Sequence, residues 1–443
     1  MVVRRGSALG RLTATVLAAA TAAGLAAGVP SAAALGVASA GRLAAESDRG
    51  WFAAARVETA SLSPRTGRPA GDIEFGQASL SADGRFVLFV DNAGDASGER
   101  ACRDTRCLLL RDRRRDVTTV VSARSDGTAV GSRGLIWSDI SGDSRLAAFN
   151  AEAYGLGPPG RRPEANLFVK HLRSGRLEAI AAPPDPAVEG TRLFISVRAV
   201  SEHGRFVGVR GGSRSGFGYP YLFDRGTGTW TRLPAPDGES EVEAMNDNGR
   251  YVAVESSSAP EGGDDLFVYD RRTGQSRQVP PGPARADASI IDATFSGDGR
   301  LLFVTWNSYN PRTDVDTVEA VMYRTRDLGV ADVIDDYGID GVDAASTTGR
   351  YIAAVAFGDH FGSDTTQSVG YDRRTDTITL VSRGRRGQPA NFWSYPTDIS
   401  ADGQTVLFNT AAGNIAPEGD DRPRPLFFDA YNDVFVTELF WRR

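Results

Sequence analysis

The chain has 443 residues, a formal net charge of −6 and 24% charged residues. Nucleic acid is excluded as a partner, because its recognition needs a clustered basic face and the sequence shows none. The length allows two domains, but a repeat that runs through most of the chain favours one.

Residues 1–40 read as a secretory signal. Arg4, Arg5 and Arg11 form a basic start, an alanine-rich apolar run follows, and Ala38-Ser39-Ala40 offers a small-residue cleavage site. The run is too short and too weakly apolar for stable membrane insertion. The sequence leaves open whether export follows the general or the twin-arginine route. We therefore expect a secreted or extracytoplasmic protein in the cell envelope, with residues 41–50 as a linker and 51–443 as the folded domain.

Residues 57–70 resemble the stretch at 378–390, which reads as the outer strand of one repeat and the link to the next. The N-terminal segment is thus predicted to be an outer strand without a repeat of its own. Such a strand can close a ring against the last repeat. Residues 434–440 also read as an outer strand, and the sequence does not decide between the two.

A short motif occurs seven times, and its first copy, Ser-Ala-Asp-Gly-Arg-Phe-Val-Leu-Phe, begins at Ser81. A Ser or Asn opens a turn, a polar residue follows and Gly supplies a left-handed position before a β-rich run, so each copy predicts a tight hairpin. Only the second copy lacks the Gly and has Ser144 there. Ser144 must adopt the strained angle or reshape the turn. The copies begin near 81, 141, 201, 246, 296, 346 and 400.

A second hairpin follows each copy, most often as an apolar strand, Asp-Arg-x-Thr-Gly and a polar strand. Two hairpins give four strands in each repeat. Seven repeats of this kind predict an all-β fold, a seven-bladed β-propeller of four-stranded antiparallel blades. The second hairpins lie at 107–121, 167–180, 222–233, 266–279, 322–334, 369–381 and 426–439.

The paired motifs resemble the TolB-type, WD40-like (PD40) propeller repeats of exported bacterial proteins. The resemblance covers nearly the whole chain after the signal segment and implies the propeller fold. It implies no single function, because such propellers serve in binding, scaffolding and catalysis.

Cys102 and Cys107 are the only cysteines. An even pair in an exported chain favours a disulfide. The acidic loops Glu261–Asp265 and Glu418–Asp421 could bind Ca²⁺, but they lack regular ligand spacing and also read as solvated turns. No metal site is therefore assigned, and no other cofactor is expected.

The loops between the two hairpins of each blade differ in every copy, and they share the face opposite the short turns. Loops on a rigid scaffold carry function, so this loop face is the predicted working face. The innermost strands also carry acids that must face a wet channel or be paired. We expect ligand contacts from aromatic and acidic residues of the fifth to seventh blades: Trp306, Tyr309, Phe361, Trp393, Tyr395, Asp292, Asp343 and Asp398. The alternative is structural, with the aromatics capping blade cores and the carboxylates accepting backbone hydrogen bonds that tie blades together.

No nucleophile elbow, H-E-x-x-H motif or histidine cluster is present in the sequence. The sequence therefore predicts no catalytic residues and favours an exported, monomeric, non-catalytic binding or scaffold module for a protein, peptide or carbohydrate. The alternative is a propeller enzyme that acts on carbohydrate with channel-mouth carboxylates as acid and base.

Overall fold

A computed structural model describes residues 56–443, except 153–154, 157–166, 184–193, 213–217, 237–238, 258–263, 282–287, 311–314, 335–337, 358–360, 417–431 and 441–443. The chain divides into Met1–Ala53 and Ala54–Arg443. The predicted signal segment and linker lie outside the described residues.

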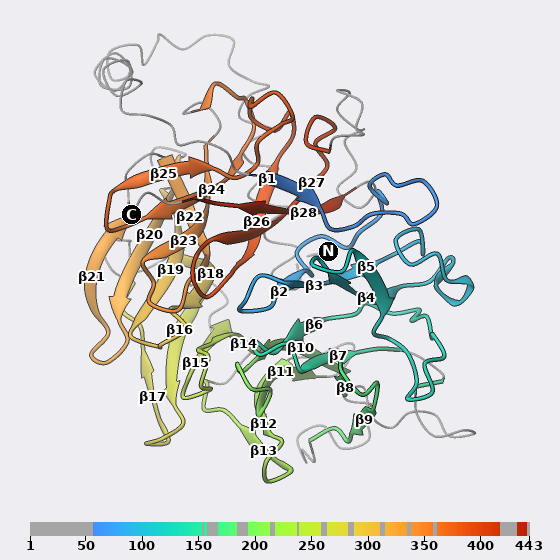
Figure 1. The fold of residues 1–443 in the computed structure, drawn as a ribbon. Coiled ribbons are helices and arrows are strands. Elements are labelled where there is room, and N and C mark those ends of the chain that lie inside the picture. Colours follow the sequence, from blue (N-terminus) through green and yellow to red (C-terminus); the bar gives the residue numbers. More distant parts are fainter. Residues whose placement is uncertain are drawn as a thin grey trace, which may run out of the picture. The chain divides into compact units, whose positions relative to one another are not determined.

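Seven four-stranded antiparallel sheets make up the described part of the chain, and they follow one another in sequence order (Figure 1). The predicted seven-bladed β-propeller is confirmed. Blade 1 contains β2 (Ser79–Leu80), β3 (Phe86–Asp91), β4 (Cys107–Asp112) and β5 (Val117–Val120). Blade 2 contains β6 (Ser138–Ile140), β7 (Leu146–Asn150), β8 (Leu167–His171) and β9 (Leu177–Ile180), and blade 3 contains β10 (Phe194–Val200), β11 (Phe206–Gly212), β12 (Gly218–Asp224) and β13 (Thr229–Arg232).

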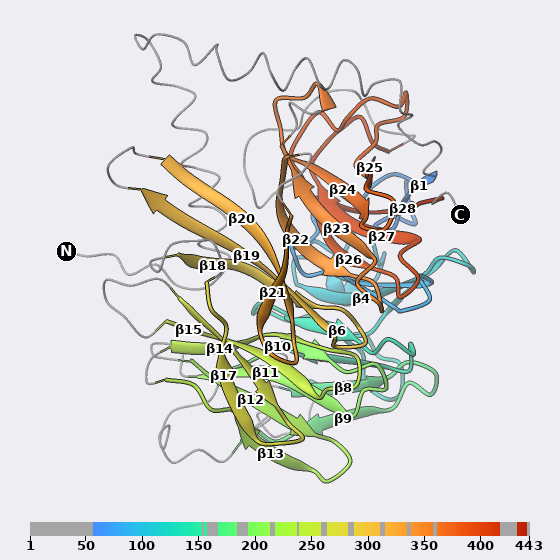
Figure 2. The ribbon, with the colours of Figure 1, turned by 90° about the vertical axis from the view of Figure 1, so that its left-hand side faces the viewer.

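The remaining blades repeat this plan. Blade 4 contains β14 (Glu239–Met245), β15 (Tyr251–Ser257), β16 (Asp265–Asp270) and β17 (Gln275–Gln278), and blade 5 contains β18 (Ser289–Phe295), β19 (Leu301–Asn310), β20 (Val315–Arg324) and β21 (Gly329–Ile334). Blade 6 contains β22 (Ile339–Ala345), β23 (Tyr351–Ala356), β24 (Gln367–Asp372) and β25 (Thr377–Leu380). Blade 7 contains β26 (Ser394–Ile399), β27 (Thr405–Thr410), β28 (Asp433–Glu438) and β1 (Arg56–Thr59). The longest pair, β19 and β20, extends beyond its neighbours (Figure 2).

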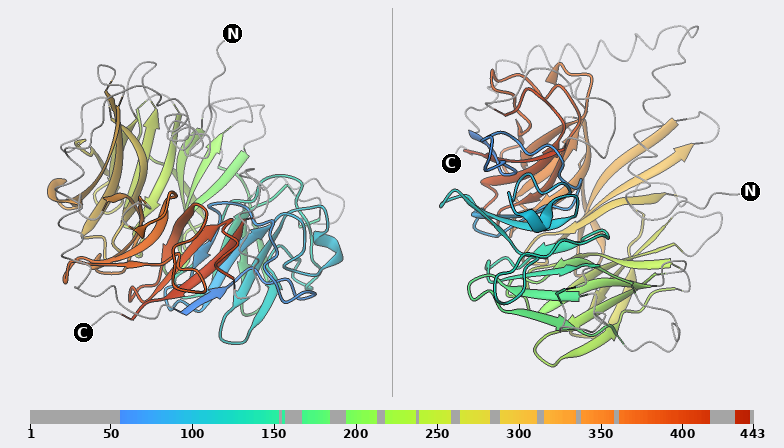
Figure 3. Two further views of the ribbon diagram at one scale, coloured as in Figure 1. Left: turned by 90° about the horizontal axis from the view of Figure 1, so that it is seen from above. Right: turned by 90° about the vertical axis from the view of Figure 1, so that its right-hand side faces the viewer.

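A short 3-10 helix, η1 (Arg100–Cys102), lies beside blade 1 (Figure 3). It ends at the predicted disulfide, which joins Cys102 to Cys107 at the start of β4, with Cα atoms 5.5 Å apart. Among the described residues, no helix has the length and apolar character needed to cross a membrane.

Blade 7 is completed by both ends of the chain, which settles the choice that the sequence left open. β28 pairs with β27, and β1 then pairs with β28, from Arg56 opposite Glu438 to Thr59 opposite Phe435. Of the two segments that read as an outer strand, the N-terminal one takes the fourth position of the blade and β28 takes the third. The second hairpin of blade 7 is therefore formed by β28 and β1, and not within residues 426–439 as the repeat predicted. A closed ring leaves no unpaired seam between the first and last strands.

The cores lie between successive blades. Leu88 and Leu108 of blade 1, for example, pack against Phe149 and Phe168 of blade 2 in one buried cluster. Each blade therefore buries its faces only against its neighbours, as the repeat predicted.

The seven short turns are built by their motif residues. In the first copy the Ser81 hydroxyl donates to Asp83 over 2.7 Å and accepts the Phe86 N–H over 2.9 Å, while Gly84 takes a φ of +68°. Where the second copy lacks glycine, Ser144 adopts the strained angle, with a φ of +61°. Of the two predicted outcomes, a strained angle or a reshaped turn, the strained angle is therefore the one observed.

Backbone hydrogen bonds link these turns into a closed circle. Ala82 N–H donates to the Gly142 carbonyl of the next blade, and Ala401 of blade 7 donates to the Ala82 carbonyl of blade 1. Between them, the N–H to carbonyl pairs are Asp143 to Glu202, Glu202 to Asp247, Asp247 to Gly297, Asp298 to Thr347, and Thr347 to Ala401.

The arginine that six of the seven turns carry explains part of the motif, and the seventh has Gln404 in its place. Arg85 forms a two-pronged ion pair with Asp112, the Asp of the second hairpin in its blade, and its guanidinium covers the Phe86 ring at 4.5 Å. Blades 3, 4 and 6 repeat both contacts with Arg205–Asp224, Arg250–Asp270 and Arg350–Asp372. The uniform hairpin face thus has a structural task.

Candidate functional site

The innermost strands carry β-bulges at charged positions. Pairing of β10 with β11, β14 with β15 and β22 with β23 shifts at Arg198, Glu243 and Asp343. Each lies three residues before the Ser or Asn that opens the next turn. A bulge leaves one residue of the strand unpaired and changes the direction of its side chain. Blades 3, 4 and 6 therefore each have a charged residue at the equivalent position of the innermost strand.

Asp292 and Asp343, both predicted site residues, interact across the junction of blades 5 and 6. Burial raises the pKa of Asp343 to about 8. Burial and the neighbouring Asp343 charge raise the pKa of Asp292 well above its usual range. Within the described part of the chain, the buried Oδ2 atom of Asp343 accepts no hydrogen bond. No ion pair to either carboxyl group is formed by the residues that the structure describes, so their mutual repulsion favours the protonated form of one of them.

Tyr395 of blade 7 belongs to the same group. Burial raises its pKa, and the charge of Asp343 adds to the rise. The ring of Phe75 meets the Tyr395 ring edge to face at 5.3 Å. The structure thus brings together three of the eight predicted ligand residues, from three consecutive blades.

A second acidic group lies next to them, in blade 4. One carboxylate oxygen each of Glu241, Glu243 and Glu255 lies within 4.8 Å of the others. Glu241 faces Glu255 across β14 and β15, a relationship that depends on strand register. The negative charge of Glu255 also contributes to the raised pKa of Asp292.

Two arginines of blade 3 offset part of this charge. Arg198 forms an ion pair with Glu241 and stacks on Trp137, with 4.4 Å between guanidinium and ring centre. Arg210 pairs with Glu239 and lies 3.6 Å from Glu241. Acids outnumber arginines in this central cluster, which consists of Glu239, Glu241, Glu243, Glu255, Asp292, Asp343, Arg198 and Arg210.

Asp398, also a predicted ligand residue, lies closer to the turns and has a structural role. Its carboxylate accepts the Leu80 N–H of blade 1 over 2.7 Å. Asp139 accepts the Val200 N–H of blade 3 over 2.6 Å in the same manner. Burial raises the pKa of each to about 7. These two carboxylates tie neighbouring blades together, as the structural alternative proposed.

Most of the predicted aromatics do not join the central cluster. Trp306 is 2% exposed and its Nε1 donates to the Tyr323 hydroxyl over 3.1 Å. Phe361 packs partly buried on the core between blades 5 and 6. Trp393 is half-buried against Phe392, with ring centres 5.1 Å apart. Tyr309 lies in β19, and its side chain is outside the described part of the structure.

The two loops weighed as calcium sites are only partly described. Asp264 accepts a hydrogen bond from Ser257, and Asp265 accepts one from Gln278 over 2.8 Å. Residues 258–263 and 417–431 lie outside the described residues. The structure therefore adds nothing to the calcium prediction.

Comparisons with known proteins identify the fold. No protein-family model and no curated protein matches the chain. Solved structures do: an oligogalacturonate lyase from Vibrio parahaemolyticus shares 11% identity over 87% of this chain and 97% of its own, with a TM-score of 0.52. An oligogalacturonate lyase in complex with manganese shares 12% identity over the same fractions, with a TM-score of 0.54.

TolB from Acinetobacter baumannii is a further structural neighbour, with 14% identity over 71% of this chain and 65% of its own and a TM-score of 0.40. The similarity to the two lyases, at 11% and 12% identity, shows a shared fold and no shared activity.

Proposed function

We propose that the protein is a non-catalytic binding propeller that holds a cationic group of a peptide or protein ligand at its centre, on the loop face. The observation that carries the proposal is the pair Asp292 and Asp343 beside Tyr395, where a buried carboxylate oxygen has no hydrogen-bond partner within the described residues.

The chemistry of the pair favours a cation. Two neighbouring carboxyl groups in a dry environment cannot both ionise cheaply, so one holds a proton at neutral pH. An arginine or lysine side chain would replace that proton, supply the missing charge and donate hydrogen bonds to the free oxygen. The Tyr395 ring would add a cation–π contact. The disulfide and the basic and apolar N-terminal segment support an extracytoplasmic location for this binding.

Calorimetric titration with a short peptide that carries one arginine tests the proposal. The same peptide with citrulline, which keeps the shape and loses the charge, is the control ligand. We expect saturable binding of the arginine peptide and at least tenfold weaker binding of the citrulline peptide. Asp343→Asn should weaken binding of the arginine peptide similarly, and the exposed Asp332→Asn, with the same change in charge, should not. Equal affinity for both peptides, or full affinity in Asp343→Asn, would contradict the proposal.

A carbohydrate-active enzyme is the second candidate, supported by carboxyl groups with pKa values near neutrality, which suit acid–base catalysis. The excess of acids at the centre repels a polyuronate, so the oligogalacturonate named for the structural neighbours fits poorly. Release of sugars from neutral glycans, lost in Asp343→Asn, would favour this candidate over the binding module.

A further inference from the structure

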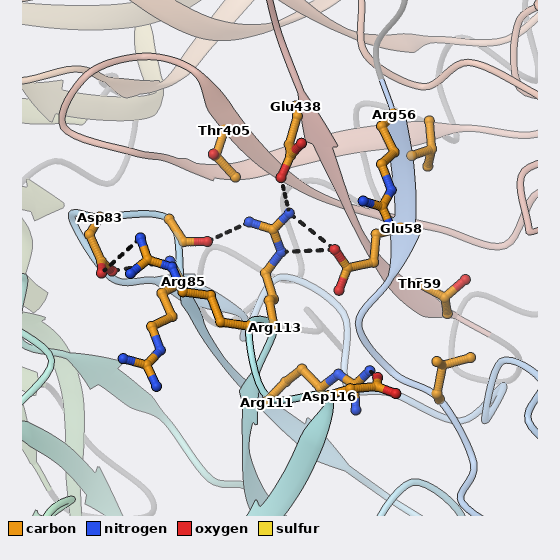
Figure 4. A pocket seen from close by; sticks show the side chains of 14 residues that line it. Arg56, Glu58, Thr59, Asp83, Arg85, Arg111, Arg113, Asp116, Thr405 and Glu438 are labelled. Atoms are coloured by element: carbon orange, nitrogen blue, oxygen red, sulfur yellow. Dashed lines mark hydrogen bonds and ion pairs between the residues drawn. The ribbon is translucent and has the colours of Figure 1, made fainter.

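A pocket of about 680 Å³ lies where the ring closes, between β1 and β28 of blade 7 and the hairpins of blade 1 (Figure 4). It is separate from the central cluster and shares no residue with it. Its charged lining consists of Arg56, Arg85, Arg111, Arg113, Arg114, Glu58, Asp83, Asp116 and Glu438.

Comparison of the equivalent residue in each blade explains why the pocket exists. Arg111 directly precedes Asp112, and blades 3 to 6 carry an aromatic residue at the equivalent position. Those aromatics are at most 8% exposed and fill the space between blades. They are Phe223, Tyr269, Tyr323 and Tyr371. Blade 2 has Lys170, whose ammonium donates to the carbonyls of Ala123 and Arg124 over 2.7 and 2.9 Å. Blade 1 therefore has a cation and a cavity where most blades have a ring.

Arg111 is incompletely paired. Its side chain is 6% exposed, and one terminal nitrogen forms an ion pair with Asp116. Its buried Nε finds no acceptor within the described residues. Burying a hydrogen-bond donor without an acceptor is unfavourable, so an acceptor bound in the pocket would stabilise Arg111.

Two further arginines have guanidinium N–H groups that could bind an anion. Arg56 begins β1, is exposed, and forms no ion pair with any described residue. Arg114 is 67% exposed and only approaches Asp83, at 3.9 Å. In contrast, Arg85 is occupied by Asp112, and Arg113 by Glu58 and Glu438.

We propose that this seam pocket binds a phosphate-type oxyanion, carried by a free ion or by a phosphate ester, through Arg111, Arg56 and Arg114. Guanidinium groups match such oxyanions with paired hydrogen bonds. Because the lining comes from β1 and from blade 1, the bound anion would connect the two sides of the closure and stabilise the folded state.

The test is a titration of the whole protein with inorganic phosphate and, separately, with glycerol phosphate, at an ionic strength held constant with sodium chloride. Calorimetry gives the affinity, and thermal unfolding gives the shift in Tm. We expect saturable binding of both ligands with one site and a rise in Tm that chloride does not produce. Arg56→Ala should weaken binding at least tenfold, and Arg115→Ala, which removes a side chain that is 77% exposed and outside the pocket lining, should leave it unchanged.

Arg111→Tyr restores the residue type of the other blades and should abolish binding while the protein stays folded. If that variant fails to fold, Arg56→Ala alone decides the question. Unsaturable effects equal to those of chloride, or full affinity in Arg56→Ala, would overturn the proposal. Saturable binding of inorganic phosphate without any binding of glycerol phosphate would support the free ion as the ligand, and saturable binding of both would support a phosphate ester as well.

Discussion

The backbone N–H of Ala401 donates a 2.9 Å hydrogen bond to the carbonyl of Ala82, although the two residues belong to the last and first blades. This bond completes the circle of seven turns. Both residues occupy the variable second position of the turn motif, where the backbone alone makes the contact. That explains why the position tolerates Ala, Gly, Glu, Asp and Thr across the repeats.

Ala401→Pro tests the circle. Proline is favoured at the second position of such a turn, so the substitution removes the N–H donor and leaves the turn intact. We expect a loss of about 1–2 kcal/mol in the free energy of unfolding, measured by denaturant titration. Ala401→Ser keeps the donor and should unfold like the natural protein. Equal stability of the two variants would show that the circle contributes nothing.

The repeat made the fold predictable, because each motif residue serves its own blade. The Ser, Asp and Gly of the turn hold one hairpin, and the Arg joins it to the Asp of the second. Blade 5 shows that the ion pair depends on both motif residues. Arg324 replaces that Asp, and among the described residues the acid that Arg300 approaches is Asp298 of its own turn, at 3.6 Å. Contacts within one repeat leave a signal at fixed spacing.

The site was less predictable, because it depends on relationships between strands and blades. Glu241 meets Glu255 only through the register of β14 and β15, and a bulge that re-aims Asp343 leaves no mark in composition. Trp306 was expected to contact a ligand from a loop between two hairpins. The 10-residue strand β19 instead continues past it, and Trp306 lies in the core between blades 4 and 5. The order of strands in blade 7 likewise depended on which chain end pairs first with β27.

Ser144→Gly should stabilise the protein. Ser144 has a φ of +61° in a turn whose other copies use glycine, and a side chain in that conformation costs about 1–2 kcal/mol. Glycine loses more entropy on folding, so the expected net gain is about 0.5–1 kcal/mol in the free energy of unfolding. Ser174→Gly, at a turn residue without a positive φ, is the matched control and should give no gain. A loss of stability in Ser144→Gly would show that the serine side chain contributes more than its strain costs.

Arg113 connects the two sides of the ring closure, so its removal should weaken the fold. Its guanidinium donates to Glu58 of β1 over 3.1 Å and to Glu438 of β28 over 3.0 Å. Its side chain is 9% exposed. Arg113→Met keeps the stem and removes the charge, and we expect a loss of about 2–3 kcal/mol by denaturant titration. Arg115→Met changes a side chain that is 77% exposed and should have little effect. Matching unfolding curves for both variants would refute the role of Arg113.

The acids at the centre predict a dependence of stability on pH. Burial raises the pKa of Asp343 to about 8 in the folded protein, against an ordinary value of 3.8. The protonated carboxyl group therefore makes its full contribution to the free energy of unfolding below about pH 4. The folded protein loses this contribution as the pH rises through about 8. Asp343→Asn cannot ionise, so its stability relative to the natural protein should rise between pH 5 and pH 8.5. Unfolding by denaturant at four or five pH values measures this difference. A difference that stays constant, or falls, with pH would contradict the buried state of Asp343.

Substitutions at Trp306 and Tyr395 should distinguish a residue that packs in the core from one that contacts the ligand. Trp306→Ala empties a core position and leaves the Tyr323 hydroxyl, which donates to the Pro280 carbonyl over 2.7 Å, without the indole donor. We expect a loss of about 3–5 kcal/mol in the free energy of unfolding. Tyr395→Leu keeps an apolar side chain of similar reach but removes the aromatic face that a cation would contact. This variant should stay folded and bind the arginine peptide about 3- to 10-fold more weakly, the range of a partly desolvated cation–π contact. Folded Trp306→Ala protein that no longer binds the peptide would instead make Trp306 a ligand residue, and would show that the loop-face aromatics reach the ligand from blade 5 as well.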